Sequence, residues 1–463
     1  MLRSTEPAAK AAGQQRRAGA TVVRRGRPAR ALAAAAAAAL ACGLAACSSS
    51  SSSGGSSSKG SIVFADVAPF SGPDAALGPA YLVSCEGTAN AMNKAGGILG
   101  HTVSCTSTDT KGDPADAVPA VGSLLSRTPN LALVIGCTSD EAAAVVPIIN
   151  SHKTVMFCMT GQLEFDHVHF PYFYRLVPPD ASESYAMTVI AEDLHYKRIA
   201  LAFGNDIGSQ TFVQPAISAI GKAGMTLVAN ETLDLNATTF RTEAEKIVQA
   251  HPDAIMTEAL GSADPTLFAE IKQLNGGTMI PIIGTSAAIL PAFYTASAKA
   301  IGAADFAANF HADNLVGTAT SGPAYQTFTQ ALLAVKGKVA NAQVGNFSTY
   351  FGQPGAVHLY DGMNLAALAM VAAGSTDTAK WQPYIISIAD GVPGAVVVTS
   401  FAQGVRELKA GKKIRFIGPG GATTFDSFHD SPGLFVIQTY SATGAVQTTG
   451  NISPTQYNAL AGG

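Results

Sequence analysis

The stretch that decides the fold is residues 61–108, which read SIVFADVAPFSGPDAALGPAYLVSCEGTANAMNKAGGILGHTVSCTST. Residues 61–65 are short and largely apolar and predict a β-strand, after which glycine and proline mark a loop. Residues 78–95 predict a helix that the pair Gly96-Gly97 ends, and residues 101–108 predict a second strand. Four residues share one face of that helix at helical spacing: Leu82, Cys85, Ala89 and Met92. Strand, helix and strand in this order predict a parallel sheet covered by helices.

The same unit repeats along the chain in two series. The first continues with predicted strands at residues 131–135 and 154–157, and the second starts after residues 174–179 with a helix over 182–195. Further strands are expected at residues 198–203, 226–231, 253–257, 280–283 and 433–438. Two such series predict an α/β protein with two Rossmann-like lobes and parallel sheets.

The expected division of the chain makes it cross between the lobes several times. We assign residues 61–178 and 310–430 to the first lobe, and residues 179–309 and 431–463 to the second. Crossings of this kind form a multi-strand hinge, so the lobes are expected to close over a cleft. A ligand would lie beyond the carboxyl ends of the strands.

The N-terminal segment has the composition of a lipoprotein export signal. Several arginines precede an uncharged apolar run, Ala31 to Ala46, and the sequence Leu44-Ala45-Ala46-Cys47 is followed by serines and glycines up to residue 58. As a helix the run would span roughly 24 Å, which is short of a hydrocarbon core of roughly 30 Å and suits a cleaved signal. We therefore predict a signal peptide with a lipobox over residues 1–47 and a Ser/Gly linker over residues 48–60.

In this interpretation the Cys47 thiol carries a diacylglycerol and holds the protein on the extracytoplasmic face of the cell membrane. An ordinary signal peptide with an incidental cysteine is the alternative. Arg24-Arg25 leaves open whether export uses the general or the twin-arginine route.

Composition excludes some classes of function. The chain is 47% hydrophobic and 13% charged, with a formal net charge of -3 that includes the basic signal. The remaining body has no stripe dense in lysine and arginine, so nucleic acid is not an expected partner. A chain of this length and apolarity can bury the cores of two lobes.

Four cysteines remain after Cys42 and Cys47 are set aside, and an even number in an exported protein favours disulfides. We predict a bond between Cys85 and Cys105, because the first lies on the apolar helix face and the second on one face of the next strand. Cys137 and Cys158 end strands that should be neighbours, a spacing compatible with a second bond. Their spacings match no zinc pattern, and no metal site is expected.

Five segments together resemble one family. They are 69–73 (PFSGP), 92–100 (MNKAGGILG), 109–117 with its Asp113-Pro114, 360–369 (YDGMNLAALA) and 425–433 (FDSFHDSPG). In this order they are similar to the type I periplasmic binding proteins of the leucine/isoleucine/valine-binding class. The resemblance implies a monomeric solute receptor, without cofactor or enzymatic activity, that delivers a small molecule to the permease and ATPase subunits of an ABC importer.

The family's carboxylate site maps only partly onto this sequence. Its hydroxyl residue at a helix start corresponds to Thr138-Ser139, where free N–H groups at a helix N-terminus suit an anion. Its small-x-Thr turn corresponds to Gly161-Gln162-Leu163, so Leu163 stands where the resemblance implies threonine, and the backbone around Thr160 and Gly161 is expected to contribute instead.

The family's ammonium site departs further. Ile207 stands at its aromatic position and Ser286 at its acidic position. A buried ammonium needs an acceptor, and Glu258 and then Asp206 are the candidates, with a solvated loop carboxylate as the alternative for each. The expected ligand-binding residues are Thr138, Ser139, Thr160, Gly161, Asp206, Glu258 and Ser286. We expect weak or no binding of leucine, isoleucine and valine, and a small amino acid or a related carboxylate or amide as the ligand.

Other sequence patterns are weaker indications of function. His167 and His169 are spaced to share a metal, but a surface histidine pair is the preferred interpretation, and Gly418-Pro419-Gly420-Gly421 lacks the Lys-Ser/Thr of a phosphate loop. No Gly-x-Ser-x-Gly elbow occurs. Two alternatives to transport stay open: a sensor that presents its closed form to a signalling partner, and an α/β hydrolase.

Overall fold

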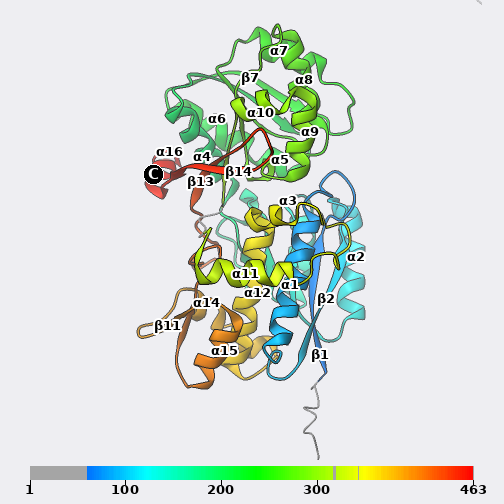
Figure 1. Cartoon of the computed structure of the whole chain (residues 1–463), viewed down its shortest axis with the longest axis vertical. Helices are drawn as coiled ribbons and strands as arrows, with labels where there is room; N and C mark the ends of the chain where they lie inside the picture. The colour runs from blue at the N-terminus through cyan, green and yellow to red at the C-terminus, as the bar shows by residue number, and fades with distance from the viewer. Residues whose placement is uncertain (1–59, 316–319, 343, 462–463) are drawn as a thin grey trace, which may run out of the picture. The chain divides into compact units, whose positions relative to one another are not determined.

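Two sheets, each covered by helices, organise the computed structural model, which describes residues 60–315, 320–342 and 344–461 (Figure 1). The expected signal peptide, Cys47 and most of the expected linker lie outside these residues. The described residues belong to one compact unit.

The first sheet is entirely parallel, with strand order β2-β1-β3-β4-β5. Its strands are β1 (Ser61–Ala68), β2 (Thr102–Asp109), β3 (Leu131–Gly136), β4 (Met156–Cys158) and β5 (Phe173–Arg175). The connecting helices are α1 (Gly78–Lys94), α2 (Pro114–Arg127) and α3 (Ser139–Ser151), with a short 3-10 turn at Leu163–Phe165. The strand and helix predicted in residues 61–95 are thereby confirmed, and so is the strand that follows them.

A later part of the chain completes this first lobe. Its elements are α11 (Gly322–Leu333), a 3-10 turn (Phe347–Gly352), α12 (Pro354–Ala373), α13 (Thr378–Trp381), α14 (Tyr384–Ala389), β11 (Val396–Val398), α15 (Phe401–Lys409) and β12 (Ile414–Phe416). The helix α12 packs against α1, α14 and α15 (Figure 1). By length and apolarity α12 could cross a membrane, but 78% of its apolar window is buried inside the protein. Its apolar sequence is therefore explained by burial in a protein core.

The second sheet has seven strands in the order β14-β13-β10-β9-β8-β6-β7. Five are parallel to one another: β6 (Arg198–Gly204), β7 (Thr226–Leu233), β8 (Ala254–Glu258), β9 (Ile282–Gly284) and β10 (Phe310–Asn314). The strands β13 (Phe435–Tyr440) and β14 (Val446–Ile452) join it antiparallel. The helices of this lobe are α4 (Asp180–Asp193), α5 (Ile207–Thr211), α6 (Val213–Lys222), α7 (Arg241–Gln249), α8 (Ala263–Leu274), α9 (Pro291–Ile301), α10 (Ala303–Asn309) and α16 (Pro454–Ala461), with a 3-10 turn at Ser286–Ala288.

One expected boundary needs correction. We assigned residues 310–430 to the first lobe, but residues 310–314 form β10, which pairs with β9 and with β13 in the second sheet. Apolar and buried positions such as Phe310 and Ala312 fill this central strand, and only afterwards does the chain return to the first lobe. Three segments connect the two sheets: residues 176–179, 315–321 and 431–434.

Both disulfide predictions are confirmed. Cys85 of α1 is bonded to Cys105 of β2, with 6.0 Å between their Cα atoms. Cys137 and Cys158, which follow β3 and end β4, are bonded with 5.5 Å between their Cα atoms. The second bond joins the chain at the carboxyl ends of two neighbouring strands, so it holds together the edge of the sheet from which the candidate site is built.

Candidate ligand cleft

A cavity of about 120 Å³ lies where residues from both lobes meet. Thr138, Ser139 and Gly161 enter it just after strands β3 and β4 of the first sheet. From the second sheet come Asp206 after β6 and Glu258 at the end of β8. The cavity is therefore built from the carboxyl ends of the strands in both sheets, where α/β proteins place their ligands.

The structure brings together six of the seven residues expected from the sequence: Thr138, Ser139, Gly161, Asp206, Glu258 and Ser286. Thr160 is not among the lining residues, but its hydroxyl lies 3.2 Å from the hydroxyl of the lining residue Ser139 and forms a hydrogen bond with it. Leu163 and Ile207, which replace two residues of the family pattern, do not line the cavity and are 39% and 47% exposed.

The sequence analysis missed the other residues that give the cavity its character. Four are carboxyl groups, Asp74, Asp140, Asp180 and Glu183, and two are aromatic, Tyr81 and Phe212. Asp140 could have been found, because it follows Ser139 at a helix start. Asp180 and Glu183 lie on the first turn of α4, directly after the first crossing between the sheets, and their burial depends on how the lobes meet.

The N-cap residue of α3, Thr138, is bonded to a carboxylate of the same helix. Thr138 donates to Glu141 twice, from its backbone N–H at 3.1 Å and from its hydroxyl at 2.6 Å, and the Thr110 hydroxyl donates to the same carboxylate at 3.0 Å. This helix end carries partial positive charge and favours an anion. Glu141 places one negative group beside this helix end, and burial raises its pKa despite these bonds.

Asp140 connects the two lobes across the cavity. One of its carboxylate oxygens accepts the backbone N–H of Gly208 at 2.7 Å, so a first-lobe side chain binds the beginning of the second-lobe helix α5. The same helix is capped by Asp206, which accepts the N–H of Ser209 at 2.7 Å. Burial and the nearby Asp206 raise the pKa of Asp140. The two lobes are therefore in direct contact at the cavity.

A second group of carboxyls lies on the side of α4 and β8. Glu183 accepts the backbone N–H of Ser286 at 2.6 Å, and Glu258 accepts the hydroxyl of Thr285. Asp180 accepts the Thr211 hydroxyl, yet burial raises its pKa to about 8. Burial raises the pKa of Glu183 and Glu258 as well. These carboxyls are too close and too buried to ionise together without a counter-charge.

Glycine is required at position 161, where the first lobe approaches the crossing segment. The backbone N–H of Asp180 donates to the Gly161 carbonyl at 2.7 Å. A Cβ added at Gly161 would overlap the Asp180 carboxyl and lie 2.9 Å from the Pro178 carbonyl oxygen. The absence of a side chain therefore lets Asp180 reach the cavity.

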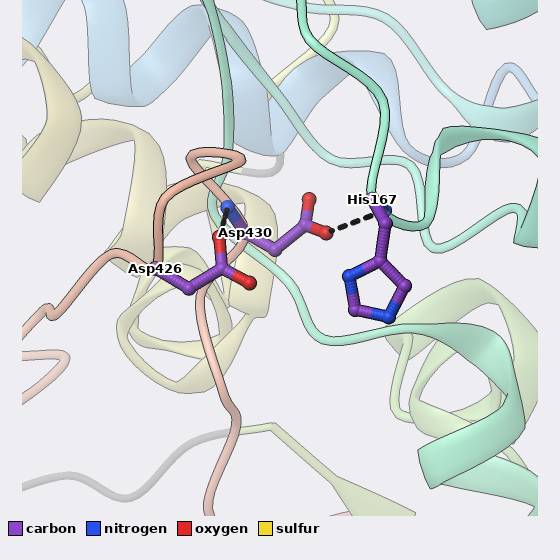
Figure 2. Close-up of side chains that lie close together, drawn as sticks. All are labelled: His167, Asp426 and Asp430. Carbon is purple, nitrogen blue, oxygen red and sulfur yellow. Dashed lines mark hydrogen bonds between the residues drawn. The ribbon is translucent and has the colours of Figure 1, made fainter.

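A separate cluster lies near the first and third crossings, where His167, Asp426 and Asp430 each offer an atom within 4.8 Å of the others (Figure 2). Most of these carboxylate oxygens are already engaged. Asp426 accepts the N–H groups of Phe428 and Asp430 at 2.8 and 3.0 Å, and Asp430 accepts the backbone N–H of His167 at 3.5 Å. We therefore interpret the cluster as a structural contact between His167 and the segment of residues 426–430.

Comparison with known proteins agrees with this geometry. The model of the family described as periplasmic binding protein matches residues 61–381. A leucine binding protein from Thermotoga maritima has a similar structure, with a TM-score of 0.66 and 18% identity over 85% of this chain and 99% of that one. A search of the curated proteins found no match.

Two further solved structures are similar and contain ligands. The branched-chain amino acid transporter substrate binding protein LivJ from Streptococcus pneumoniae, in complex with isoleucine, has a TM-score of 0.64 and 17% identity over 84% of this chain and 99% of that one. A solute binding protein from R. palustris, in complex with 4-hydroxybenzoate, has a TM-score of 0.65 and 16% identity over 85% and 97%. With two sheets joined by three crossings around one cleft, and with a family match over most of its length, the chain belongs to the periplasmic binding protein family and has the type I fold of the leucine/isoleucine/valine-binding proteins.

Proposed function

We propose that this protein is the extracytoplasmic solute-binding lipoprotein of an ABC importer of the branched-chain amino acid type. It captures a small solute between its two lobes and delivers it to the permease, which the ATPase subunits drive. The observation that carries the proposal is the cavity lined from the carboxyl ends of both sheets. Family membership supports it, because proteins of this family bind solutes rather than transform them.

The charges of the residues that line the cleft indicate which kind of ligand it can bind. The sequence favoured a small amino acid or a related carboxylate or amide, and the isoleucine and 4-hydroxybenzoate of the two similar structures each carry a carboxylate. Here the Glu141 carboxylate bonds the N-cap residue of α3, and six carboxyls line the cavity. Of the expected ligands, an amino acid is supported by its ammonium group more than by its carboxylate.

The experiment that tests solute binding is mass spectrometry of the small molecules released when the purified protein is denatured. We expect one compound in near-stoichiometric amount, and a smaller amount from Glu258→Ala, in which one lining carboxyl is lost. Release of nothing from the wild type, together with no stabilisation by any compound of a broad solute panel, would contradict the function.

Anchoring is a separate prediction. Cys47→Ser should move the protein from the membrane fraction to the soluble fraction, because the thiol that would carry the lipid is gone. Its ligand affinity should not change, since the described cleft residues all lie beyond residue 73. Fractionation with a blot measures the first outcome and calorimetry the second. A Cys47→Ser protein that stays in the membrane fraction would contradict the lipid anchor.

A further inference from the structure

The charges that line the cavity are all of one sign. Among the described lining residues none is lysine, arginine or histidine, and six carry carboxyl groups: Asp74, Asp140, Asp180, Glu183, Asp206 and Glu258. A ligand in this cavity therefore meets acidic groups from both lobes.

Two basic side chains close to cleft residues are already bonded to other groups. Arg175 forms ion pairs with Asp166 at 2.8 Å and with Asp430 at 3.3 Å, and its side chain has no exposed surface. His358 bonds the Leu315 carbonyl through Nε2 at 3.1 Å, and burial lowers its pKa to about 4, so its ring is neutral. Burial raises the pKa of the lining Asp180 more than the Arg175 charge lowers it, and neither Arg175 nor His358 is among the residues that line the cavity.

We propose, on the basis of the solute-binding function above, that the cleft selects a small organic cation: a molecule with one or more ammonium or guanidinium groups and no carboxylate. Such a ligand supplies the positive charge that the cavity lacks. A buried carboxylate needs a counter-charge or hydrogen-bond donors, and a ligand carboxylate would instead add another negative group.

The acidic groups form two sets that a single ligand can contact. Asp140 and Asp206 both raise the pKa of Asp74, which places these three carboxyls in one electrostatic set. Glu183 and Asp180 both raise that of Glu258 and form the second set with it. Asp206 belongs to the surroundings of both sets. One of its oxygens, Oδ1, caps α5 through the N–H of Ser209, and the other, Oδ2, is buried beside Gly204, so the residue is held at the edge of the cavity that it lines.

The aromatic lining fits the same ligand class. Tyr81 and Phe212 both line the cavity, and the faces of aromatic rings attract ammonium and guanidinium groups. Gly355 makes room for the first ring, because a Cβ there would overlap Tyr81. Apolar side chains such as Met159 and Leu290 complete the wall and would contact the hydrocarbon part of the cation.

The test is calorimetry of the purified protein with ligands that differ in charge at similar size. The four-carbon series 1,4-diaminobutane, 1,4-butanediol and butanedioate compares a cation, a neutral molecule and an anion. Butylamine, choline and agmatine extend the cations, and leucine and benzoate extend the carboxylates. We expect the best cation to bind about a hundredfold more tightly than its neutral or anionic counterpart, as loss of paired buried charges implies.

Two variants and one control locate the effect. Asp206→Asn should weaken cation binding about tenfold or more, and asparagine still caps a helix, so α5 is preserved. Glu258→Gln should act in the same direction. Glu245→Gln, an exposed carboxylate that pairs with Arg241 away from the cavity, is the matched control and should leave binding unchanged.

Each outcome decides a different point. Tighter binding of a cation, weakened by Asp206→Asn and kept in Glu245→Gln, supports the charge assignment. Binding of leucine, benzoate or butanediol in preference to every cation, or release of a neutral or anionic compound from the denatured protein, overturns the assignment but keeps the solute-binding function. If no compound binds and nothing is released, the solute-binding function itself fails.

Discussion

Arg175 is the buried charge that ties two of the three inter-lobe segments together. It is the last residue of β5, just before the first crossing, and its side chain is fully buried. Its Nη1 lies 2.8 Å from Asp166, and its Nε lies 3.3 Å from Asp430, just before the third crossing, as an ion pair without hydrogen-bond alignment. In addition, its backbone N–H donates to the His429 carbonyl at 3.0 Å. Arg175→Met is therefore predicted to destabilise the hinge.

The magnitude follows from the burial of the partners. Methionine keeps much of the side-chain volume, so the main loss is the positive charge. Asp430 is 10% exposed and Asp166 is 27% exposed, so one carboxylate is left nearly buried and the other partly hydrated. Burial raises the pKa of Asp430 even with the arginine present, which means that the pair is incompletely compensated. We take the lower end for breaking a buried pair, about 3 kcal/mol, or roughly a hundredfold in the unfolding equilibrium.

Urea denaturation followed by circular dichroism measures this loss at pH 7. Arg241→Met is the matched control, because Arg241 pairs with Glu245 at 3.2 Å and both side chains are about half exposed at 46% and 49%. Its pair should contribute about 0.5 kcal/mol or less. If Arg175→Met costs no more free energy of unfolding than Arg241→Met, the buried pair does not stabilise the hinge and the reasoning fails.

Three further outcomes are expected. Burial raises the pKa of Asp74 and raises that of Asp180 from 3.8 to about 8, so the ligand-free native state binds extra protons. Its free energy of unfolding should therefore fall as pH rises from about 4 to about 8. A melting temperature that rises over this pH range would contradict the pKa shifts. Replacing both Cys85 and Cys105 by alanine should lower that free energy by about 3 kcal/mol for a loop closed over 20 residues, measured by urea denaturation against the wild type; an unchanged midpoint would show that the bond is not formed. Gly161→Ala should cost about 1–3 kcal/mol and weaken ligand binding, because its Cβ overlaps the Asp180 carboxyl, and calorimetry that finds wild-type affinity would refute this.

The local sequence pattern was sufficient to predict the architecture, because each strand or helix can be recognised from a few consecutive residues. Apolar strands such as residues 131–135, followed by amphipathic helices, predict a parallel sheet wherever they occur. The cysteine pairs followed from the same logic, since Cys85 and Cys105 lie on a helix face and an adjacent strand face that must meet, and Cys137 and Cys158 end neighbouring strands. The boundary at residue 310 failed because the apolar strand β10 has the same pattern in either lobe, and one of its two partners, β13, is distant in the sequence.

The residues of the candidate site also divide into those that the sequence could predict and those that it could not. Residues at the carboxyl end of a predicted strand, such as Ser139 and Glu258, could be named from the sequence, because the geometry of parallel sheets places them at the cleft. Asp180 and Glu183 could not, because a carboxyl on the first turn of a helix is ordinarily a solvated group. They become buried, and the charge of the cleft becomes acidic, only when α4 packs against β9 and β10 of the second sheet. The sequence by itself thus determined the two sheets and the edges from which the cleft is built, which depend on short-range pattern. The tertiary structure alone decided which charges face one another there, since burial and electrostatic interaction depend on distances between segments that the chain order does not encode.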